Sequence, residues 1–311
     1  MVSNNEVRFN RSLHKRNKEQ WVFISMLAPT IILLIVFNYI PMGGIIIAFQ
    51  RFVPAKGMFS TNQKWVGLQN FERAFSDPIF MQALRNTLFI SCNKIILNLL
   101  AAIFVSILIN ELRTSGLRRS VQTAFYLPHF VSWVILGSVL RDMLSAEGLV
   151  NAISSKLVGY KISFMTNNTV FPWVLIWSDV WKEFGFNTIV YLAAITNIDP
   201  GLYEAAIVDG ANKVRQIWHV TLPGMVPIIV LMILLNIGNI FNANFDQVFN
   251  MYSPQVYRSG DVIDTLVYRK GLLDSNYSLA TAIGLFKSII SCALIGTSYY
   301  AAYKFADYRA F

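Results

Sequence analysis

Long apolar blocks alternate with shorter polar stretches along this chain. Each block is near the roughly 20 apolar residues that a helix needs to cross the hydrocarbon core of a bilayer. The blocks are continuous and lack the period-two alternation of a membrane barrel strand, so they predict helices. We therefore expect an all-α integral membrane protein with six transmembrane helices. The predicted spans are 21–49, 84–110, 121–144, 171–197, 224–245 and 279–305.

The distribution of lysine and arginine predicts how these spans are oriented. Residues 1–20 are polar and hold five such residues, which is typical of a tail facing anionic lipid. With the N-terminus inside, the cytoplasmic segments hold twelve lysines and arginines, and the outer segments hold ten over considerably more residues. Because cytoplasmic loops are enriched in both residues, the density favours N-in and C-in. The expected organisation is a basic cytoplasmic tail at 1–20 and a six-helix transmembrane domain at 21–311.

Composition agrees with a membrane protein and excludes other classes. Of the 311 residues, 55% are hydrophobic and 14% are charged, too apolar for a soluble domain of this size. The formal charge of +9 is explained by a membrane surface, so no nucleic-acid partner is expected. Cys92 and Cys292 lie inside apolar blocks, and His14, His129 and His219 are far apart. With no phosphate-binding loop either, we expect no disulfide, metal site, ATP site or catalytic residue in this chain.

One polar island, residues 204–223, separates two apolar blocks and has the pattern of a helix, a tight break and a second short helix. Gly210 tolerates the left-handed conformation that often ends a helix, and Pro223 suits a first helical turn. Two interpretations remain open. The island is an ordinary loop in which Glu204 and Asp209 cap backbone groups or neutralise Arg215, or it is a protrusion that docks on another protein.

The spacing within this island resembles the cytoplasmic coupling loop of the permease subunits of binding-protein-dependent ABC importers. That pattern runs E-A-A-x-x-D-G-A, five free positions, an aromatic or apolar residue and a closing leucine-proline. The matching residues are Glu204, Ala205, Ala206, Asp209, Gly210, Ala211, Leu222 and Pro223. Ile217 stands where the family usually has phenylalanine, with Trp218 beside it. The stretches 39–50, 65–71 and 239–250 are similar to the carbohydrate-importing branch.

This resemblance implies a type I ABC importer fold and a set of partners. It implies a second, related permease that completes a heterodimer, two cytoplasmic ATPases that bind ATP and magnesium, and an extracytoplasmic solute-binding protein that delivers a carbohydrate. The coupling loop at 204–223 would dock on an ATPase and transmit its movement to the spans, which would work by alternating access. The chain would lie in a bacterial inner membrane, in contact with lipid, and carry no cofactor itself.

Three tryptophans in the fourth predicted span are candidates for the substrate pathway. Trp173, Trp177 and Trp181 recur every four residues, so their indoles lie along one helical face. Indole rings stack on the C–H faces of sugars, and their N–H groups bond hydroxyls. Tryptophans near a span's end also anchor it in the headgroup layer without any ligand. A pathway and an anchoring belt both remain open.

Asparagines in the fifth predicted span form a second candidate. Asn236, Asn239 and Asn242 recur every three residues and give the span a polar stripe. Amides at membrane depth either hold helices together or line a watery path. A sugar path needs many neutral donors and acceptors, so the stripe is compatible with either role.

Lysines within the apolar blocks need an explanation of their own. A lysine at the centre of a span costs on the order of 2.5–3.5 kcal/mol on insertion scales, so Lys94 requires a partner or a watery cavity. Lys94 is expected to meet an anionic sugar, such as alginate or oligogalacturonate, or an acidic residue of a neighbouring subunit. Lys182 and Lys287 are expected to snorkel toward an interface.

A membrane-embedded enzyme acting on lipid-linked sugars is the alternative from another class, and a channel is a weaker third. Such an enzyme needs a carboxylate pair or a metal cluster at membrane depth. The acidic residues near the spans, Glu111, Asp179, Glu183 and Asp246, are spread over several blocks. The expected function is therefore uptake of an oligosaccharide or polysaccharide, and the sequence does not decide whether that sugar is acidic.

Overall fold

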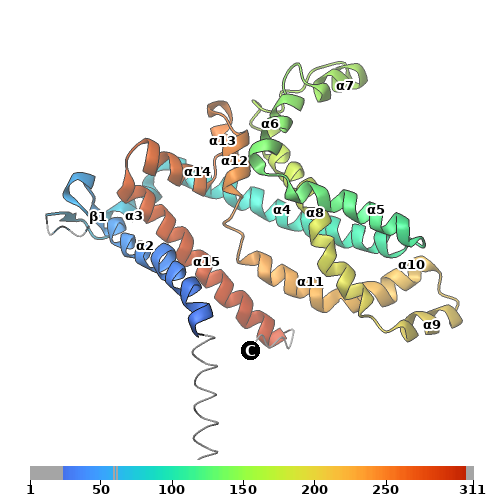
Figure 1. The fold of residues 1–311 in the computed structure, drawn as a ribbon. Coiled ribbons are helices and arrows are strands. Elements are labelled where there is room, and N and C mark those ends of the chain that lie inside the picture. The colour runs from blue at the N-terminus through green and yellow to red at the C-terminus, as the bar shows by residue number, and fades with distance from the viewer. Residues whose placement is uncertain (1–23, 59, 61, 306–311) are drawn as a thin grey trace, which may run out of the picture.

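The structure, a computed structural model, describes residues 24–58, 60 and 62–305. Helices dominate this part of the chain (Figure 1), and its strands are β1 (Gln50–Arg51) and β2 (Lys64–Trp65). The two strands pair antiparallel, with Gln50 opposite Trp65. The expected helical membrane fold is confirmed, and this short hairpin is an addition to it. The predicted basic tail at 1–20 lies outside the described residues.

The first helical stretch runs from Ile24 to Phe49 and contains α2 (Ile40–Met42). The further α-helices are α3 (Gln69–Ser76), α4 (Pro78–Asn110), α5 (Ser115–Tyr126), α6 (Trp133–Met143), α7 (Leu149–Val158), α8 (Phe171–Thr196), α9 (Pro200–Val208), α10 (Lys213–Gln216), α11 (Leu222–Ile237), α12 (Phe245–Met251), α13 (Tyr257–Gly260), α14 (Ile263–Tyr268) and α15 (Tyr277–Phe305).

The number of uninterrupted spans is lower than the sequence predicts. By length and composition, four helices among the described residues are able to cross a membrane, and a bent pair makes a fifth if it is one span. The four are Ile24–Phe49, Pro78–Asn110, Lys213–Ile237 and Tyr277–Ala301. α8 has 26 residues but carries three charged residues near its middle, Asp179, Lys182 and Glu183, and this charge content sets it apart from the four. The six-span count therefore remains a prediction.

The third predicted span, 121–144, is not one straight helix. The helical segment Ser115–Phe130, which contains α5, meets α6 at 97°. Pro128 lies in the 3₁₀ turn between them, where its ring and missing N–H disfavour a continuing α-helix. Ser132 then begins α6, because its hydroxyl accepts a hydrogen bond from the Ile135 N–H at 3.4 Å. The prediction of one unbroken helix here is wrong.

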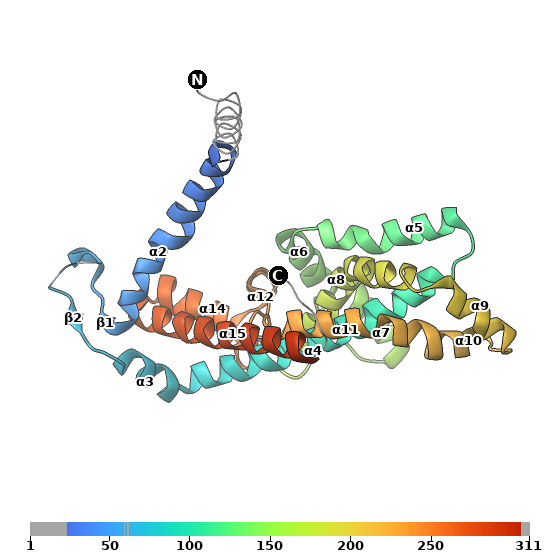
Figure 2. The same cartoon turned by 90° about the horizontal axis from the view of Figure 1, so that it is seen from below.

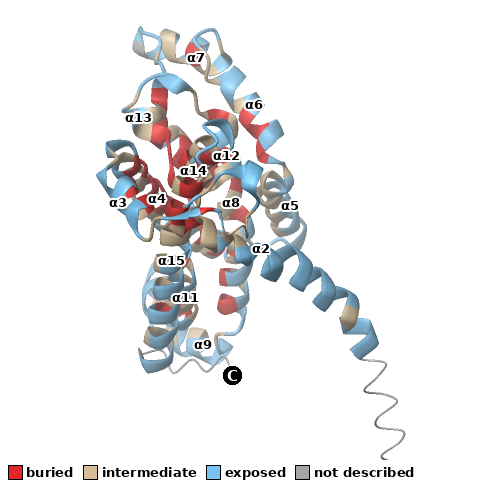
Figure 3. Ribbon diagram, turned by 90° about the vertical axis from the view of Figure 1, so that its left-hand side faces the viewer, coloured by how far each residue is buried: buried red, intermediate tan, exposed pale blue. Residues whose placement is uncertain are grey.

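The first helical stretch stands apart from the rest of the molecule (Figure 2). Only 6% of its most apolar window is buried, and its ribbon is mostly exposed in Figure 3. Its last residues, Gly43–Phe49, lie against α15. The Asn70 amide fixes this end by donating to the carbonyls of Ala48 and Gln50 at 2.8 and 3.0 Å. An apolar surface of this extent requires lipid or another membrane helix around it.

α4 and α8 form the central helix pair, and three apolar clusters surround it. The first joins α4, α6, α8 and α12, the second joins α3, α4, α14 and α15, and the third joins α4, α8 and α11. Buried members of the first cluster include Ile90, Leu175 and Met251. Those of the second include Phe80, Ile263 and Leu266, and those of the third include Ala102, Tyr191 and Met225. The core is thus spread along α4 and α8 rather than gathered at one point.

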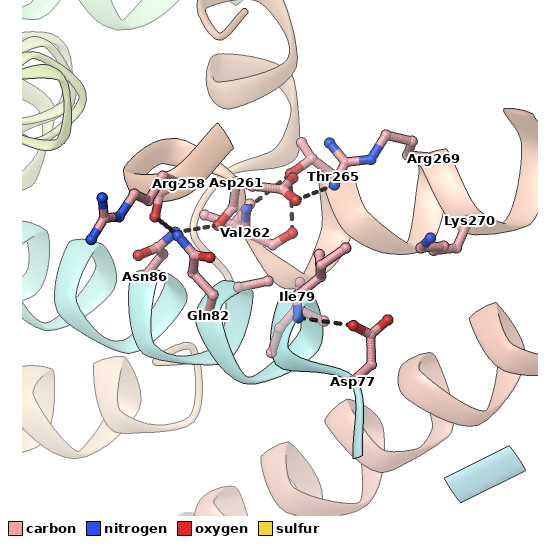
Figure 4. Close-up of polar contacts among 12 residues, drawn as sticks. Asp77, Ile79, Gln82, Asn86, Arg258, Asp261, Val262, Thr265, Arg269 and Lys270 are labelled. Carbon is pink, nitrogen blue, oxygen red and sulfur yellow. Dashed lines mark hydrogen bonds and ion pairs between the residues drawn. The ribbon is translucent and has the colours of Figure 1, made fainter. Parts of the chain in front are cut away.

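A polar network fastens the segment between α11 and α15 to α4 (Figure 4). The Asn86 amide donates to the carbonyls of Asp261 and Arg258 at 3.0 and 3.2 Å. The Asp261 carboxylate accepts a hydrogen bond from the Thr265 hydroxyl at 2.7 Å and pairs with Arg269. Burial raises the pKa of the Asp261 carboxyl, and the Thr265 hydrogen bond and the Arg269 charge offset only part of that rise. α13 and α14 are therefore held in place by buried polar contacts.

Close contact between α5 and α8 depends on Gly185, because a methyl group added there would overlap the Phe125 carbonyl. We expect Gly185→Ala to lower the melting temperature of the purified protein, because overpacking at this contact reduces the free energy of unfolding by about 1–3 kcal/mol. Gly284→Ala in α15 is the control, because nothing lies within 4 Å of its added methyl group. Equal melting temperatures for the two variants would contradict this account of the α5–α8 contact.

Candidate functional site

A polar cavity of about 640 Å³ lies between α4, α8, α11 and the start of α12. Its wall contains six asparagines: Asn98, Asn187, Asn236, Asn239, Asn242 and Asn244. It also contains four charged residues: Lys94, Asp179, Glu183 and Asp246. The Ser91 hydroxyl beside this wall is buried and has no hydrogen-bond partner among the described residues. The cavity wall therefore suits a polar ligand.

The cavity lies where the fifth predicted span breaks. α11 ends at Ile237, and the chain is not helical again until α12 begins at Phe245, so the prediction of a helix over 224–245 is wrong at its end. Asn244 has a φ of 66°, a left-handed conformation that asparagine tolerates, and its side chain caps α12. Irregular backbone at membrane depth is stable only when it is buried in protein or lines a watery cavity. The break and the cavity are thus one feature.

The three asparagines predicted from the stripe all lie in the cavity wall. Their hydrogen bonds bear on the choice between helix contact and cavity lining. The Asn236 amide donates to the Met232 carbonyl of its own helix at 2.8 Å, and the Asn242 side chain accepts from the Asn244 N–H at 3.3 Å. These local bonds favour cavity lining. The interhelical amide pair of this wall is Asn187 with Asn98, at 3.2 Å.

Lys94 finds its partner inside its own chain, which corrects the expectation of an acidic residue from a neighbouring subunit. Lys94 is 6% exposed, and its Nζ lies 3.2 Å from an Asp179 carboxylate oxygen. Nζ also donates to the Ala243 carbonyl at 3.0 Å and to the Gln247 amide oxygen. The Gln247 amide nitrogen in turn donates to the Leu175 carbonyl at 2.7 Å. These contacts join α4, α8 and α12.

The other two lysines of the apolar blocks are paired as well. Lys182 is buried, so the expectation that it snorkels is wrong, whereas Lys287 is half-buried and its snorkelling remains a prediction. Lys182 lies 3.0 Å from Glu183 and donates to the His129 carbonyl at 2.7 Å. The same Glu183 carboxylate lies 2.7 Å from the His129 ring nitrogen. Lys287 pairs with Asp264. These pairs offset the cost of placing charge within the apolar blocks.

Acidic residues that the sequence places in different blocks converge on the cavity. Asp179, Glu183 and Asp246 all line it, whereas Glu111 pairs with Lys213 at 3.2 Å elsewhere. With Lys94 as the single cation among the described lining residues, the wall has a formal charge of −2 when all four groups are ionised. A sequence signal for this wall existed, because Asp179, Glu183, Asn187 and Tyr191 recur every four residues on α8.

The predicted tryptophan face does not line the cavity. Trp173, Trp177 and Trp181 are 41%, 58% and 50% exposed. Trp177 and Trp181 are offset by two residues from Asp179 and Glu183, which places them on roughly the opposite side of α8. Trp173 instead meets the Phe89 ring edge-on at 5.8 Å. The anchoring interpretation, or contact with another chain, suits this face better than the pathway.

The polar island at 204–223 forms the helix, break and helix that its pattern predicts. α9 begins earlier than expected, at Pro200, with Asp199 as its cap. The helix ends at Val208, and Gly210 follows with a φ of +72°, while the Ala211 N–H donates to the Ala206 carbonyl at 2.8 Å. Asn212 caps α10, and Leu222 and Pro223 open α11. In Figure 1, α9 and α10 lie at the far end of α8 from α6 and α7.

The surface of this loop is suited to a protein partner. Glu204 and Asp209 are exposed and take part in no ion pair among the described residues, so neither neutralises Arg215. Large apolar side chains are exposed on the same segment, namely Leu202, Ile207, Val208, Val214 and Trp218. Exposed apolar groups rimmed by charge mark interaction sites on proteins.

Comparison with known proteins agrees with these features. The family described as "Binding-protein-dependent transport system inner membrane component" matches residues 95–245. The polygalacturonan/rhamnogalacturonan transport system permease protein YteP of Bacillus subtilis is 37% identical over 96% of this chain and 92% of its own length. Protein LplB of the same organism is 36% identical over 93% of this chain and 90% of its own length.

Solved structures show the same similarity in three dimensions. A chain of a bacterial ABC transporter that imports the acidic polysaccharide alginate superposes with a TM-score of 0.85 at 36% identity, covering 94% of this chain and 99% of that one. A second structure shows such a transporter with a periplasmic protein that holds an alginate pentasaccharide; its matching chain has a TM-score of 0.81 at 36% identity, covering 93% of this chain and 96% of that one. The chain belongs to the inner-membrane permease components of binding-protein-dependent ABC importers, within their carbohydrate-importing branch.

Proposed function

We propose that this chain is one of two related permeases that together enclose the path of an ATP-driven importer for an oligosaccharide or polysaccharide. The observation that carries the proposal is the amide-lined cavity at the break in the fifth span. Amides donate and accept hydrogen bonds without charge, which suits sugar hydroxyls. Relatives named for polygalacturonan and alginate transport support a sugar chain as substrate.

The loop at 204–223 couples this path to ATP hydrolysis in our proposal. Two cytoplasmic ATPases bind ATP and magnesium, and one of them receives the exposed side chains of α9 and α10. A continuous helical stretch, Lys213–Ile237, then leads from the loop to Asn236 in the cavity wall. Movement of the loop therefore reaches the cavity through one helix, which supports alternating access.

The remaining partners follow from the same scheme. We propose an N-in, C-in orientation in a bacterial inner membrane, which places the coupling loop on the side that holds ATP. A solute-binding protein delivers the sugar from outside, and the structure of the alginate transporter with its loaded periplasmic protein supports this step. The second permease is a different but related chain that closes the other half of the path.

We further propose that this half of the path binds the hydroxyl groups of the sugar rather than its carboxylates. Lys94 is held by Asp179, Ala243 and Gln247, and the rest of the charged lining is acidic. An anionic sugar would therefore find no unpaired cation among the described lining residues. If the substrate is a polyuronate, its carboxylates are bound by the partner permease or the solute-binding protein.

The carboxylates that line the cavity do not support the alternative of a membrane-embedded enzyme. Asp179 is paired with Lys94, and Glu183 is paired with Lys182 and lies beside His129. General acid–base catalysis by two carboxyl groups needs one that is protonated and one that is ionised, and both must be free to exchange a proton with the substrate. The family is one of transport permeases, whose ATPase is a separate subunit.

The functional proposal is tested by coupling. In the assembled transporter in liposomes, we expect ATP hydrolysis to rise with a loaded solute-binding protein and fragments of polygalacturonan, alginate or arabinan. Gly210→Val should abolish that rise, because valine at a φ of +72° costs about 1–3 kcal/mol and distorts the loop. Gly159→Val, at a φ of +84° beyond α7, is the matched control and should leave coupling intact. Equal coupling in both variants would remove the role of the loop.

The cavity is tested by its amides. Asn239→Leu and Asn242→Leu should each raise the half-saturating glycan concentration about threefold to tenfold, because each removes hydrogen bonds worth about 0.5–1.5 kcal/mol. Asn93→Leu is the control, since Asn93 bonds the Phe89 carbonyl of its own helix at 2.8 Å and lies outside the cavity wall. A shift of the same size in the control would contradict the assignment.

The role of Lys94 is tested by stability. Lys94→Met leaves the Asp179 carboxylate buried without its cation, so we expect a loss of about 3–5 kcal/mol and a lower melting temperature. The double variant Lys94→Met with Asp179→Leu should recover much of that loss. If Lys94 binds the sugar instead, the single variant would keep its melting temperature and raise the half-saturating concentration of acidic fragments only.

A further inference from the structure

Five aromatic residues of the segment between α11 and α15 form a connected series, which we call the aromatic ladder: Phe245, Phe249, Tyr252, Tyr257 and Tyr268. Phe245 and Phe249 lie one turn apart on α12 and stack at 5.2 Å with an interplanar angle of 17°. Phe249 meets Tyr268 at 5.0 Å and Tyr252 at 6.3 Å. Tyr252 meets Tyr257 at 5.0 Å. The ladder thus runs from α12 to α13 and the end of α14.

One end of the ladder opens on the polar cavity. Phe245 lines the cavity, next to Asp246 and Asn244. At the other end, the Arg269 guanidinium lies over the Tyr257 ring, 4.1 Å from its centroid. The same arginine pairs with the buried Asp261, so the polar network of Figure 4 holds this end in place. The ladder is therefore a fixed surface that leads to the cavity.

The rings of the ladder are more exposed to solvent than the buried aromatic rings of the apolar clusters. Phe249 is 38% exposed, and the other four are half-buried. By contrast, Phe241, only a few residues earlier in the chain, is 6% exposed within an apolar cluster. Exposed aromatic faces are costly in water and favourable against the flat C–H faces of sugars, while tyrosine hydroxyls bond sugar hydroxyls. A sugar ring stacked on Phe249 would cover the face that this chain leaves exposed.

We propose that the aromatic ladder is a binding track for the saccharide units that follow the one held in the cavity. This inference rests on the proposed function and adds a second subsite to it. An oligosaccharide presents one ring after another, as the ladder presents one aromatic ring after another, whereas a monosaccharide in the cavity does not extend along the ladder. The ladder therefore makes this permease selective for chain length.

The test compares short and long sugars in the assembled transporter in liposomes. The probes are the monomer, the dimer and longer oligomers of whichever glycan among polygalacturonan, alginate and arabinan fragments stimulates the wild type. Phe249→Leu keeps an apolar side chain and removes the ring face. We expect its half-saturating concentration to rise about threefold to tenfold for longer oligomers, equivalent to about 0.6–1.4 kcal/mol, and to stay unchanged for the monomer. Maximal ATP hydrolysis should be unchanged.

Phe75→Leu is the matched control. Phe75 is 46% exposed and belongs to a different ring cluster, with Phe80 and Phe286, that lies outside the cavity wall. Phe249→Trp adds a second readout that does not depend on the leucine variant folding. Its emission should change when the longer oligomer is added and the monomer should cause no such change, with Phe75→Trp silent to both.

The outcomes separate the two proposals. A wild-type transporter that no glycan stimulates would overturn the proposed function itself. A stimulated wild type with equal shifts for monomer and oligomer in Phe249→Leu, or with no oligomer response in Phe249→Trp, would overturn the ladder and leave the proposed function standing.

Discussion

The contact between Lys94 and Asp179 is the interaction on which the arrangement of the spans depends. A lone lysine at membrane depth is costly, and this one is satisfied by a carboxylate from α8 and a backbone carbonyl, Ala243, from the irregular stretch before α12. The charge therefore brings three separate segments to one point. It also lies where the fifth span breaks, and the asparagines beside that break form part of the cavity wall.

The same architecture connects the two ends of the molecule. The loop that carries Glu204 and Asp209 continues through one helical stretch into the wall that carries Asn236. A displacement at one end of a helix is felt at its other end with little loss, because the backbone hydrogen bonds resist stretching. In the proposed importer, this helix is the route by which a separate ATPase drives the path.

Several of these features could be predicted from the sequence, and others could not. Apolar block length indicates a helical membrane protein, and the spacing from Glu204 to Pro223 predicts a helix, a break and a second helix, because both are local properties. The partner of Lys94 is not local, since Asp179 is distant in the chain and only the α4–α8 contact brings them together. The tryptophans illustrate the same limit. A period of four defines a helical face, but which neighbour that face meets depends on the whole bundle.

The first helical stretch touches the remainder of the chain mainly through its end at Gly43–Phe49. None of the cavity wall comes from it. A stretch attached in this way faces the surrounding lipid or a neighbouring subunit rather than the cargo. Its exposed apolar face therefore bears on where the permease sits in an assembly and not on what the permease carries.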